Sequence, residues 1–556
     1  MALHTKLKTK RKSKNVNAKG RAYAEWFRKH YAELLIISIL VYAAFYAVAT
    51  SVGPSYNGDD MAYASVALQI IHGTYHESTY IYTVRFLQIF PIAAFYLLGV
   101  GYLSSSAWNV LSFVITVGLV YLLGKELSGK NVGLVAALAF SFFPEVLNYT
   151  GTMSDDIPLM MFTSLTILCL MYAVRSNSKK WYFICGALLI TPMLVTPLGF
   201  LIFPFVLVYL LIELLRKKLS INRTTLYFVY GIAASVVVLC AVNYLLSGNP
   251  LITFTLNFNY YSKPGVPGYG TLGALAGPNY YVNIIFPYDL TSFIYNLLVN
   301  HSISQISFWE NNTVGLFFYA FAISAVYLIL KRDRRAYVPL LWFGVMFAYL
   351  SIGPENLTFS PFSYTLMIRL DRYMMPLVAS VVLTIAIAVA RFVEDGRYHK
   401  DTLGRLAISI AALAFLVIMA VPLNTFWYQS KISQLSDQMQ IANYISGLPN
   451  STRIYYVNGL SQVIIFSGAV NYSRFQAYDQ VSNCGSLPDG AYVVVPKNVE
   501  YYNLNYTPNP LPYCPGWKLA FSPKNEGNYS SDVVAQSYVF MADLYYIASN
   551  SIKNKK

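Results

Sequence analysis

Residues 33–52 read ELLIISILVYAAFYAVATSV and are followed by GPSYNGDD at 53–60. As a helix, the first stretch is long enough to cross about 30 Å of hydrocarbon, because a helix rises about 1.5 Å per residue. Comparable apolar runs recur as far as residue 424, and 56% of the 556 residues are hydrophobic while only 12% are charged. The sequence therefore predicts a membrane protein with many spans rather than a set of soluble domains.

Positive charge gives the orientation of these spans. The formal net charge is +15, and ten lysines or arginines lie in the first 30 residues, directly before the first span. Short basic clusters also separate later apolar runs, which is the pattern of cytoplasmic loops in membrane proteins. We therefore interpret the charge as a topology signal and not as a nucleic-acid-binding surface, and residues 1–30 as a basic cytoplasmic tail.

Counting loops by their charge gives about eleven transmembrane helices between residues 31 and 425. The expected spans lie near 33–52, 106–124, 132–148, 158–174, 225–247, 314–330, 338–352, 373–390 and 406–424. Residues 182–215 begin and end at basic loops, so they cross an even number of times or form a re-entrant pair, with a turn near Pro192 and Pro197. The expected outer loops are 53–105, 149–157, 248–313 and 353–371.

Residues 426–556 are less apolar and are expected outside the cell membrane, as a small extracytoplasmic α/β domain. The segments 453–459 and 491–496 are short, β-branched and aromatic, as in strands. Cys484 and Cys514 lie in this part, and we expect them to form a disulfide; two unpaired thiols are the alternative. Acceptor sites for N-glycosylation occur at Asn450, Asn471, Asn505 and Asn528. A cover over the membrane site, or a module that binds the acceptor, is the role we favour.

Two acidic pairs lie at the expected outer ends of helices. Asp59-Asp60 precedes a segment with helical apolar spacing, and Asp155-Asp156 precedes Pro158 and the fourth span. Each pair could simply cap its helix, where the dipole favours negative charge. If the pairs converge, their carboxylates could instead bind a divalent metal ion, for which Asp60 and Asp156 are candidates, or act as a general base toward a hydroxyl.

The outer side carries few cations before the C-terminal domain: Arg85, Lys263, Arg369 and Arg372. Arginine matches phosphate oxygens in a bidentate manner, so these residues are candidate phosphate contacts, although each could be a plain headgroup-level cation. Residues 86–103, FLQIFPIAAFYLLGVGYL, are apolar but interrupted by proline and glycine, and counting them as a span would invert every later loop. We expect them at the outer interface, beside a lipid-like substrate with a phosphate head.

These features together resemble the GT-C superfamily of membrane glycosyltransferases, in the branch of protein O-mannosyltransferases and aminoarabinose transferases. The resemblance covers roughly residues 30–425. It rests on the first-loop acidic pair with His72-Gly73-Thr74-Tyr75, the interfacial helix, the turn GKELSGKNVGLVAALAF (124–140), Asp156-Ile157-Pro158, and Arg372-Tyr373 with Pro376. An oligosaccharyltransferase would have a WWDYG-like sequence, and this sequence has none.

The resemblance implies transfer of a sugar from a polyprenyl-phosphate donor, such as a dolichyl phosphate sugar, to an acceptor hydroxyl at the outer face, usually with inversion. Asp59 matches the family's base or acceptor-positioning aspartate, and Asp156 matches its second-loop aspartate. Asp60 stands where the family usually has glutamate, and Thr196 lies where it often has a lysine, a contact that Lys263 could supply. Asp155 and Tyr373 are further candidates. The acceptor could be a protein, lipid or glycan.

A transporter or flippase for a lipid-linked sugar is the main alternative, since it would also use apolar helices and phosphate-binding cations. It should place ionisable residues near the middle of the membrane and often contains internal repeats. This sequence places its charges at the outer rim and has no evident repeat. A scaffold that displays the C-terminal domain would leave both acidic pairs unexplained. The transferase is therefore the favoured interpretation.

Overall fold

The structure is a computed structural model of the whole chain. It describes residues 26, 29–51, 59–76, 81–99, 103–217, 219, 222–262, 306–352, 354–359, 362–366, 371–395, 404–411, 413–414, 418, 420–421, 424–425, 440–457, 474–478, 487–498, 517–522 and 541–547.

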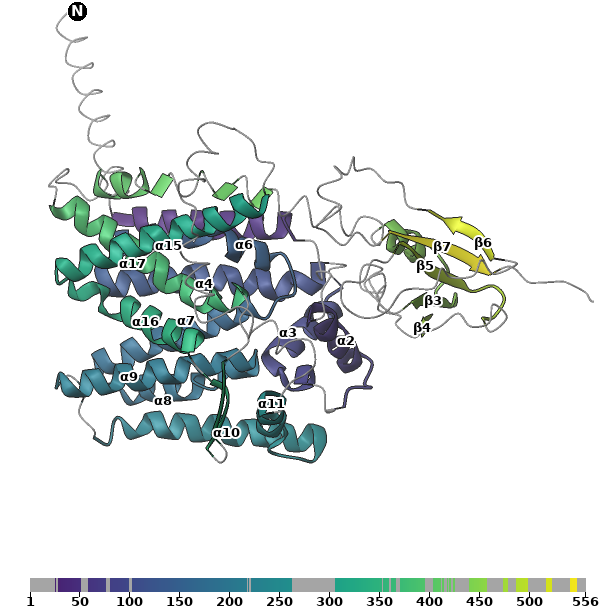
Figure 1. Cartoon of the computed structure of the whole chain (residues 1–556), viewed down its shortest axis with the longest axis horizontal. Coiled ribbons are helices and arrows are strands. Elements are labelled where there is room, and N and C mark those ends of the chain that lie inside the picture. The colour runs from purple at the N-terminus through teal and green to yellow at the C-terminus, as the bar shows by residue number, and fades with distance from the viewer. Residues whose placement is uncertain are drawn as a thin grey trace, which may run out of the picture.

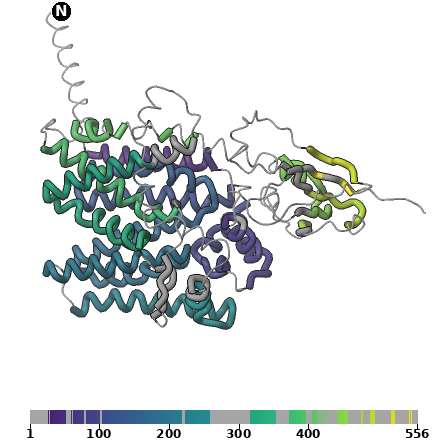
Figure 2. Tube along the Cα trace, viewed as in Figure 1, coloured from purple at the N-terminus to yellow at the C-terminus, as the bar shows by residue number. Residues whose placement is uncertain are grey.

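Long apolar helices form most of the molecule and lie side by side as a bundle (Figure 1; Figure 2). Among the described residues, seven are long and apolar enough to cross a membrane: Lys29–Ala49, α4 (Ser104–Ser128), α7 (Asp156–Ser176), Pro197–Leu215 with α9 (Ile202–Leu215), α10 (Leu226–Ser247), Arg334–Ile352 with α16 (Tyr337–Ile352), and Arg372–Asp395 with α17 (Met375–Asp395). An eighth arises if α5 (Lys130–Ser141) and α6 (Pro144–Thr150), bent by 61°, form one span. The chain is an integral membrane protein.

The expected spans fall on these helices. Those from 33 to 174 and from 225 to 390 all coincide with a helix, including α15 (Ile306–Leu330) for the expected span at 314–330. The span expected at 406–424 is described only in pieces. The total of eleven crossings therefore stays a prediction, while the mainly helical membrane fold is confirmed.

Residues 182–215 turn back where the two prolines predicted a turn. Helix α8 (Lys179–Leu188) has 10 residues, about 15 Å, which is too short to cross the hydrocarbon. The short 3₁₀ helices η3 (Thr191–Leu194) and η4 (Pro197–Leu201) follow, with Pro192 and Pro197 near their starts, and lead into α9. This segment is a short helix, a proline-containing turn and a longer helix.

Helix α17 is the centre of the bundle. Of an apolar stretch of 18 residues in this helix, 83% are buried. The helix contacts α4, α5, α7, α15 and α16. Every residue from 375 to 388 is buried. A helix that is apolar on all sides packs inside other helices, so α17 forms a fixed core around which its neighbours pack.

Three short elements pack at the end of the bundle where α7 and α17 begin. They are α2 (Asp59–Ile71), the 3₁₀ helix η1 (Ile81–Val84) and α3 (Phe86–Leu97); α2 packs on α3, and α3 packs on α4. Helix α3 has 12 residues, about 18 Å, so it does not span the membrane, in agreement with the expected interfacial helix. Helix α11 (Ile252–Ser262) contacts η1 from the other side.

Two small sheets complete the structure. Strands β1 (Pro354–Phe359) and β2 (Phe362–Leu366) form an antiparallel hairpin. The C-terminal region has a five-stranded mixed sheet in the order β4 (Phe475–Tyr478), β3 (Ile454–Val457), β5 (Tyr492–Asn498), β7 (Met541–Ile547) and β6 (Trp517–Phe521). Strands β3 and β5 coincide with the two predicted strands. The sheet lies beyond the end of the bundle that carries α2 and α3 (Figure 1). Cys484, Cys514 and three of the four glycosylation sites lie outside the described residues, whereas Asn450 is exposed.

Two glycines allow α8 and α10 to cross closely. A Cβ atom at Gly186 would overlap the carbonyl oxygen of Phe228, and one at Gly231 would overlap that of Phe183. Small residues at such crossings let helix backbones approach within a membrane. Gly118 of α4 has no atom within 4 Å of the same position, so it provides a control.

We expect Gly186→Ala and Gly231→Ala to destabilise the protein, because an extra methyl group at a packed crossing costs about 1–3 kcal/mol. The melting temperature of the detergent-purified chain should fall in both variants and should not fall in Gly118→Ala. Equal melting of all three variants and the wild type would contradict the close crossing.

Candidate active site

Six charged residues gather where α2, η1 and α3 meet the first turn of α7 and the segment before α17. They are Asp59 and Asp60 in the first turn of α2, Arg85 between η1 and α3, Asp155 and Asp156 at the start of α7, and Arg372 in η7 (Asp371–Met374). Asp60, Arg85, Asp155 and Asp156 are buried, although each would be costly to remove from water without a partner. The two acidic pairs therefore converge, which was one of the alternatives that the sequence left open.

Arg85 and Asp155 form the more buried of two ion pairs. Arg85 Nη1 lies 3.0 Å from Asp155 Oδ2, and the side chains are only 9% and 7% exposed. The Tyr63 hydroxyl donates to the same Asp155 oxygen at 2.9 Å and accepts from Arg85. The Arg85 guanidinium lies 4.6 Å from the ring centre of Tyr82 and 5.5 Å from that of Tyr63. The pair is enclosed by aromatic rings and joins the start of α3 to the start of α7.

Arg372 and Asp59 form the second ion pair, which is more open. Arg372 Nη2 lies 2.6 Å from Asp59 Oδ2, and each side chain is 24% exposed. The Tyr82 hydroxyl donates to the other carboxylate oxygen, Asp59 Oδ1. Burial would raise the pKa of Asp59, but Arg372, the Tyr82 hydroxyl and Arg85 outweigh it and lower this pKa below its ordinary value. Asp59 is thus held as a carboxylate at the accessible edge of the site.

The remaining two carboxylates contact the segment before α7. The Met153 backbone N–H donates to Asp60 Oδ2 at 3.4 Å, and the Ser154 hydroxyl donates to Asp156 Oδ2 at 2.6 Å. The Asp156 N–H in turn donates to Ser154 Oγ at 3.2 Å. The backbone of this segment is held by amide side chains, since Asn109 Nδ2 donates to the Ser154 carbonyl at 2.7 Å. The segment 153–156 therefore connects both acidic pairs.

The simple helix-cap alternative does not account for Asp155. This residue is the N-cap of α7, yet its side chain makes no capping hydrogen bond. Its carboxylate instead accepts from Tyr63 and Arg85. Asp59 and Asp60, favoured at a helix start by the helix dipole, also make tertiary contacts. Asp156 differs, since it bonds locally to Ser154.

Several residues of the site were missed from the sequence. Tyr63 lies one helical turn after Asp59, and Tyr82 lies three residues before Arg85, but nothing in their spacing identifies a hydrogen-bond partner. Gln88 and Asn109 had a usable signal, since each is a polar residue inside an apolar stretch and such residues need partners. Both are fully buried, and Gln88 Nε2 donates to the carbonyls of Met153 and Ser154.

The remaining predicted residues do not take part in the hydrogen bonds described above, or lie where the structure does not describe the chain. Lys263 and Arg369 lie outside the described residues. Tyr373 follows Arg372, whose guanidinium lies 5.9 Å from the tyrosine ring centre. Thr196, at the position where the resemblance leads one to expect a lysine, precedes η4 and is buried.

In the described part of the chain, few side chains that could bind a metal ion lie close together. No three His, Cys, Asp or Glu side chains come together there in a group that could hold a metal. The two predicted ligands, Asp60 and Asp156, already accept hydrogen bonds from Met153 and Ser154. These residues fit a divalent ion poorly, and a metal site at this pair stays a prediction.

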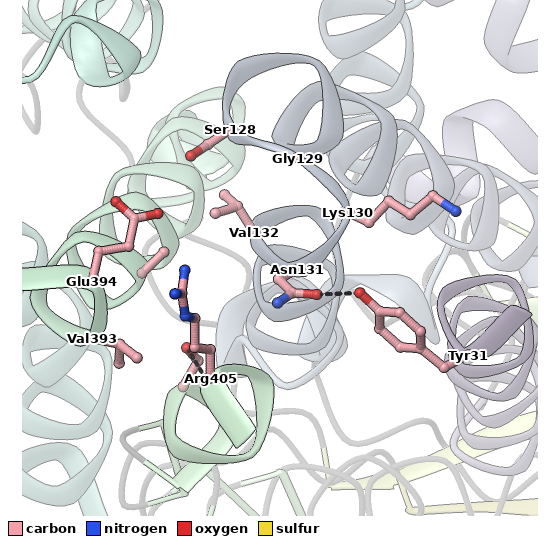
Figure 3. A pocket seen from close by; sticks show the side chains of 11 residues that line it. Tyr31, Ser128, Gly129, Lys130, Asn131, Val132, Val393, Glu394 and Arg405 are labelled. Atoms are coloured by element: carbon pink, nitrogen blue, oxygen red, sulfur yellow. Dashed lines mark hydrogen bonds between the residues drawn. The ribbon is translucent and has the colours of Figure 1, made fainter. Parts of the chain in front are cut away.

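A cavity of about 300 Å³ lies at the opposite end of α17 from Arg372. Its lining includes Tyr31, Lys130, Asn131, Glu394 and Arg405, and the Tyr31 hydroxyl donates to Asn131 Oδ1 at 2.6 Å (Figure 3). Helix α17 has 21 residues, so its two ends are about 30 Å apart. None of the predicted catalytic or phosphate-binding residues that the structure describes lines this cavity.

A family model described as dolichyl-phosphate-mannose-protein mannosyltransferase matches residues 87–243. This is a little over a quarter of the chain, and it includes Asp155 and Asp156. The crystal structure of ArnT from Cupriavidus metallidurans in the apo state is similar to this chain, with a TM-score of 0.53 at 13% identity, covering 85% of this chain and 93% of that one. This likeness shows that the two chains share a fold.

ArnT bound to undecaprenyl phosphate also matches, with a TM-score of 0.53 and 12% identity, over 84% of this chain and 93% of that one. An apo oligosaccharyltransferase from Archaeoglobus fulgidus reaches a TM-score of 0.47 at 15% identity, over 80% of this chain and 64% of that one. No curated protein sequence matches the chain.

We expect the Arg85–Asp155 pair to behave as one unit in stability measurements. Asp155→Asn and Arg85→Met should each destabilise the chain by about 3 kcal/mol, because each leaves a buried charge without its partner. The double variant should lose less than the sum of the two, since it leaves no unpaired charge. Unfolding of the detergent-purified protein by heat or denaturant measures all four forms.

The exposed pair of Lys130 and Glu33, 2.8 Å apart, provides the control for this cycle. Lys130→Met and Glu33→Gln should change stability little, singly or together. Strictly additive losses for Arg85 and Asp155 would show that the buried pair contributes no coupling.

Proposed function

We propose that this protein transfers a sugar from a polyprenyl-phosphate donor to an acceptor hydroxyl at the outer face of the membrane, with inversion at the sugar carbon. The observation that carries the proposal is the open ion pair, in which the Asp59 carboxylate and the Arg372 guanidinium meet at 2.6 Å and remain partly exposed. A carboxylate and a fixed cation are the two groups that such a transfer requires.

In the proposed step the acceptor oxygen attacks the anomeric carbon of the donor. A new carbon–oxygen bond forms, and the bond between that carbon and the phosphate oxygen breaks. The acceptor proton passes to the Asp59 carboxylate, and the polyprenyl phosphate leaves with the bonding electrons and an additional negative charge. Arg372 stabilises this charge, which is largest after the transition state. One displacement with one base leaves no covalent sugar on the enzyme.

The buried charges have supporting roles in this proposal. Arg85 is enclosed by Tyr63, Tyr82 and Asp155, so we assign it to holding the site together, and any contact with phosphate would be secondary. Asp156 lies near the reaction centre and orients the segment before α7 through Ser154. Lys263 and Arg369 remain proposed phosphate contacts.

The surroundings suit a lipid donor. Helix α3 follows Arg85 directly and ends in Leu97 and Leu98, which are 70% and 71% exposed. An apolar surface of this kind at a membrane interface contacts lipid chains. The family model is named for a dolichyl-phosphate-mannose donor, and one ArnT structure contains undecaprenyl phosphate. A polyprenyl phosphate is therefore the donor class we propose, with its sugar left open.

The orientation and the acceptor are proposed from charge and arrangement. Basic loops favour a cytoplasmic N-terminus, which puts the starts of α7 and α17 at the outer face. The C-terminal sheet lies beyond the same end of the bundle as α2 and α3 (Figure 1), where it could bind the acceptor or cover the site. A protein, lipid or glycan hydroxyl would serve as acceptor.

We expect Asp59→Asn to lower the rate of transfer by a factor of about 10² to 10⁴, the usual contribution of a general base. Asp156→Asn should also lower it, because a neutral amide oxygen accepts the Ser154 hydrogen bond less strongly than the carboxylate does. The assay follows release of polyprenyl phosphate from a panel of radiolabelled polyprenyl-phosphate sugars, with native membrane extract as acceptor and the full chain in detergent.

Asp395→Asn is the matched control, because Asp395 pairs with Lys331 at 2.9 Å at the other end of α17 and is 29% exposed. It should transfer at the wild-type rate. Wild-type transfer by Asp59→Asn would remove the proposed base. If no donor supports transfer and the chain instead moves lipid-linked sugar across the membrane of reconstituted vesicles, the protein is a flippase and not a transferase. Loss of transfer in EDTA that is restored by Mg²⁺ or Mn²⁺ would support the metal site at Asp60 and Asp156.

A further inference from the structure

The two ion pairs of the site differ in how accessible they are to a ligand. The side chains of Arg85 and Asp155 are less than a tenth exposed, and the guanidinium lies against two tyrosine rings. Arg372 and Asp59 are each 24% exposed. A charged ligand that enters the site therefore reaches the second pair first, and only the second pair can be exchanged without opening the aromatic cluster.

The open ion pair of Arg372 and Asp59 also holds together two groups that the proposed reaction must use separately. A donor phosphate requires a guanidinium, and acceptor deprotonation requires a carboxylate that can take up a proton. While Arg372 contacts Asp59, each neutralises the other, and the pKa of Asp59 stays lowered. A carboxylate with a lowered pKa is a weak base at neutral pH.

We propose that the donor phosphate and the Asp59 carboxylate compete for the Arg372 guanidinium, so that binding of the donor releases Asp59 to act as the base. This inference rests on the proposed function and adds an order to it. The base becomes effective only after an anionic lipid has taken its partner. The site would then respond to the phosphate group itself, and a neutral lipid would leave Asp59 paired.

The contacts of Asp59 allow this exchange without loss of its position. Arg372 holds Oδ2, whereas the Tyr82 hydroxyl holds Oδ1. Tyr82 is itself held, because its ring lies 4.6 Å from the Arg85 guanidinium, which is paired with Asp155. When Arg372 turns to the phosphate, Asp59 stays in place through Tyr82. Tyr82 is thus a positioning residue, and the buried pair is the fixed support for the exchangeable one.

Competition has a consequence that a transfer assay alone would not reveal. If the carboxylate opposes the phosphate for one guanidinium, removing the carboxylate should tighten lipid phosphate binding while it abolishes catalysis. Undecaprenyl phosphate without a sugar serves as the probe, and its affinity for the full chain in detergent is measured by titration calorimetry. Coupling between two ligands of one group is typically 5-fold or more, so we expect the Kd of Asp59→Asn to be about 5 to 10 times lower than that of the wild type.

Two further variants show whether the effect passes through Arg372. Arg372→Gln should weaken binding of undecaprenyl phosphate, and adding Asp59→Asn to this variant should not strengthen it. If Asp59 simply repelled the phosphate, Asp59→Asn would strengthen binding both in the wild-type chain and in Arg372→Gln. Tyr82→Phe keeps the ring over Arg85 and should lower kcat while leaving the lipid phosphate Kd within about 2-fold. Asp395→Asn should bind as the wild type does. Should Asp59→Asn melt early, Asp59→Ser replaces it.

The outcomes separate the inference from the function on which it rests. If Asp59→Asn binds undecaprenyl phosphate equally well or more weakly, while the wild-type chain still transfers sugar, the proposed competition for Arg372 is wrong and the proposed transferase function is unaffected. Tightening in both the wild-type and Arg372→Gln backgrounds would also overturn the competition. No binding of undecaprenyl phosphate by the wild-type chain would overturn both the lipid-phosphate donor and the competition.

Discussion

The buried pair of Arg85 and Asp155 is the contact on which the arrangement of the site depends. It connects the interfacial helix α3, which does not cross the membrane, to the first turn of the spanning helix α7. Two charges removed from water are tolerated only with good geometry and further hydrogen bonds, and here Tyr63 supplies them. Because the pair has one favourable arrangement, it fixes where α2 and η1 lie relative to the bundle.

The position of Tyr82 follows from that arrangement and determines the reactive edge. With its ring against Arg85, its hydroxyl reaches Asp59, which also meets Arg372 at the start of α17. Helix α17 is the most enclosed helix of the bundle, so Arg372 is presented from a rigid element. A closed ion pair thus supports an open one.

The sequence was informative about the fold because span length and loop charge are strong physical signals. It located nearly every described helix, the non-spanning α3 and two strands of the C-terminal sheet. It also pointed to Asp59, Asp155, Arg85 and Arg372 as candidates, which the structure brings together, since charges at a membrane surface need partners or a task. It could not determine which arginine pairs with which aspartate, and it did not identify Tyr63 and Tyr82 as part of the site. Those contacts depend on how α2 is rotated against α7 and α17, and helical spacing does not determine that rotation.

The most direct measurement is a structure of the purified chain with undecaprenyl phosphate, determined by electron cryomicroscopy. Our account predicts the phosphate within hydrogen-bond distance of Arg372, with Asp59 no longer in contact with that guanidinium and still held by Tyr82. The pair of Arg85 and Asp155 should be unchanged. A phosphate bound elsewhere, for example in the cavity at the other end of α17, or an Arg372 that contacts Asp59 as before with the phosphate in place, would contradict it.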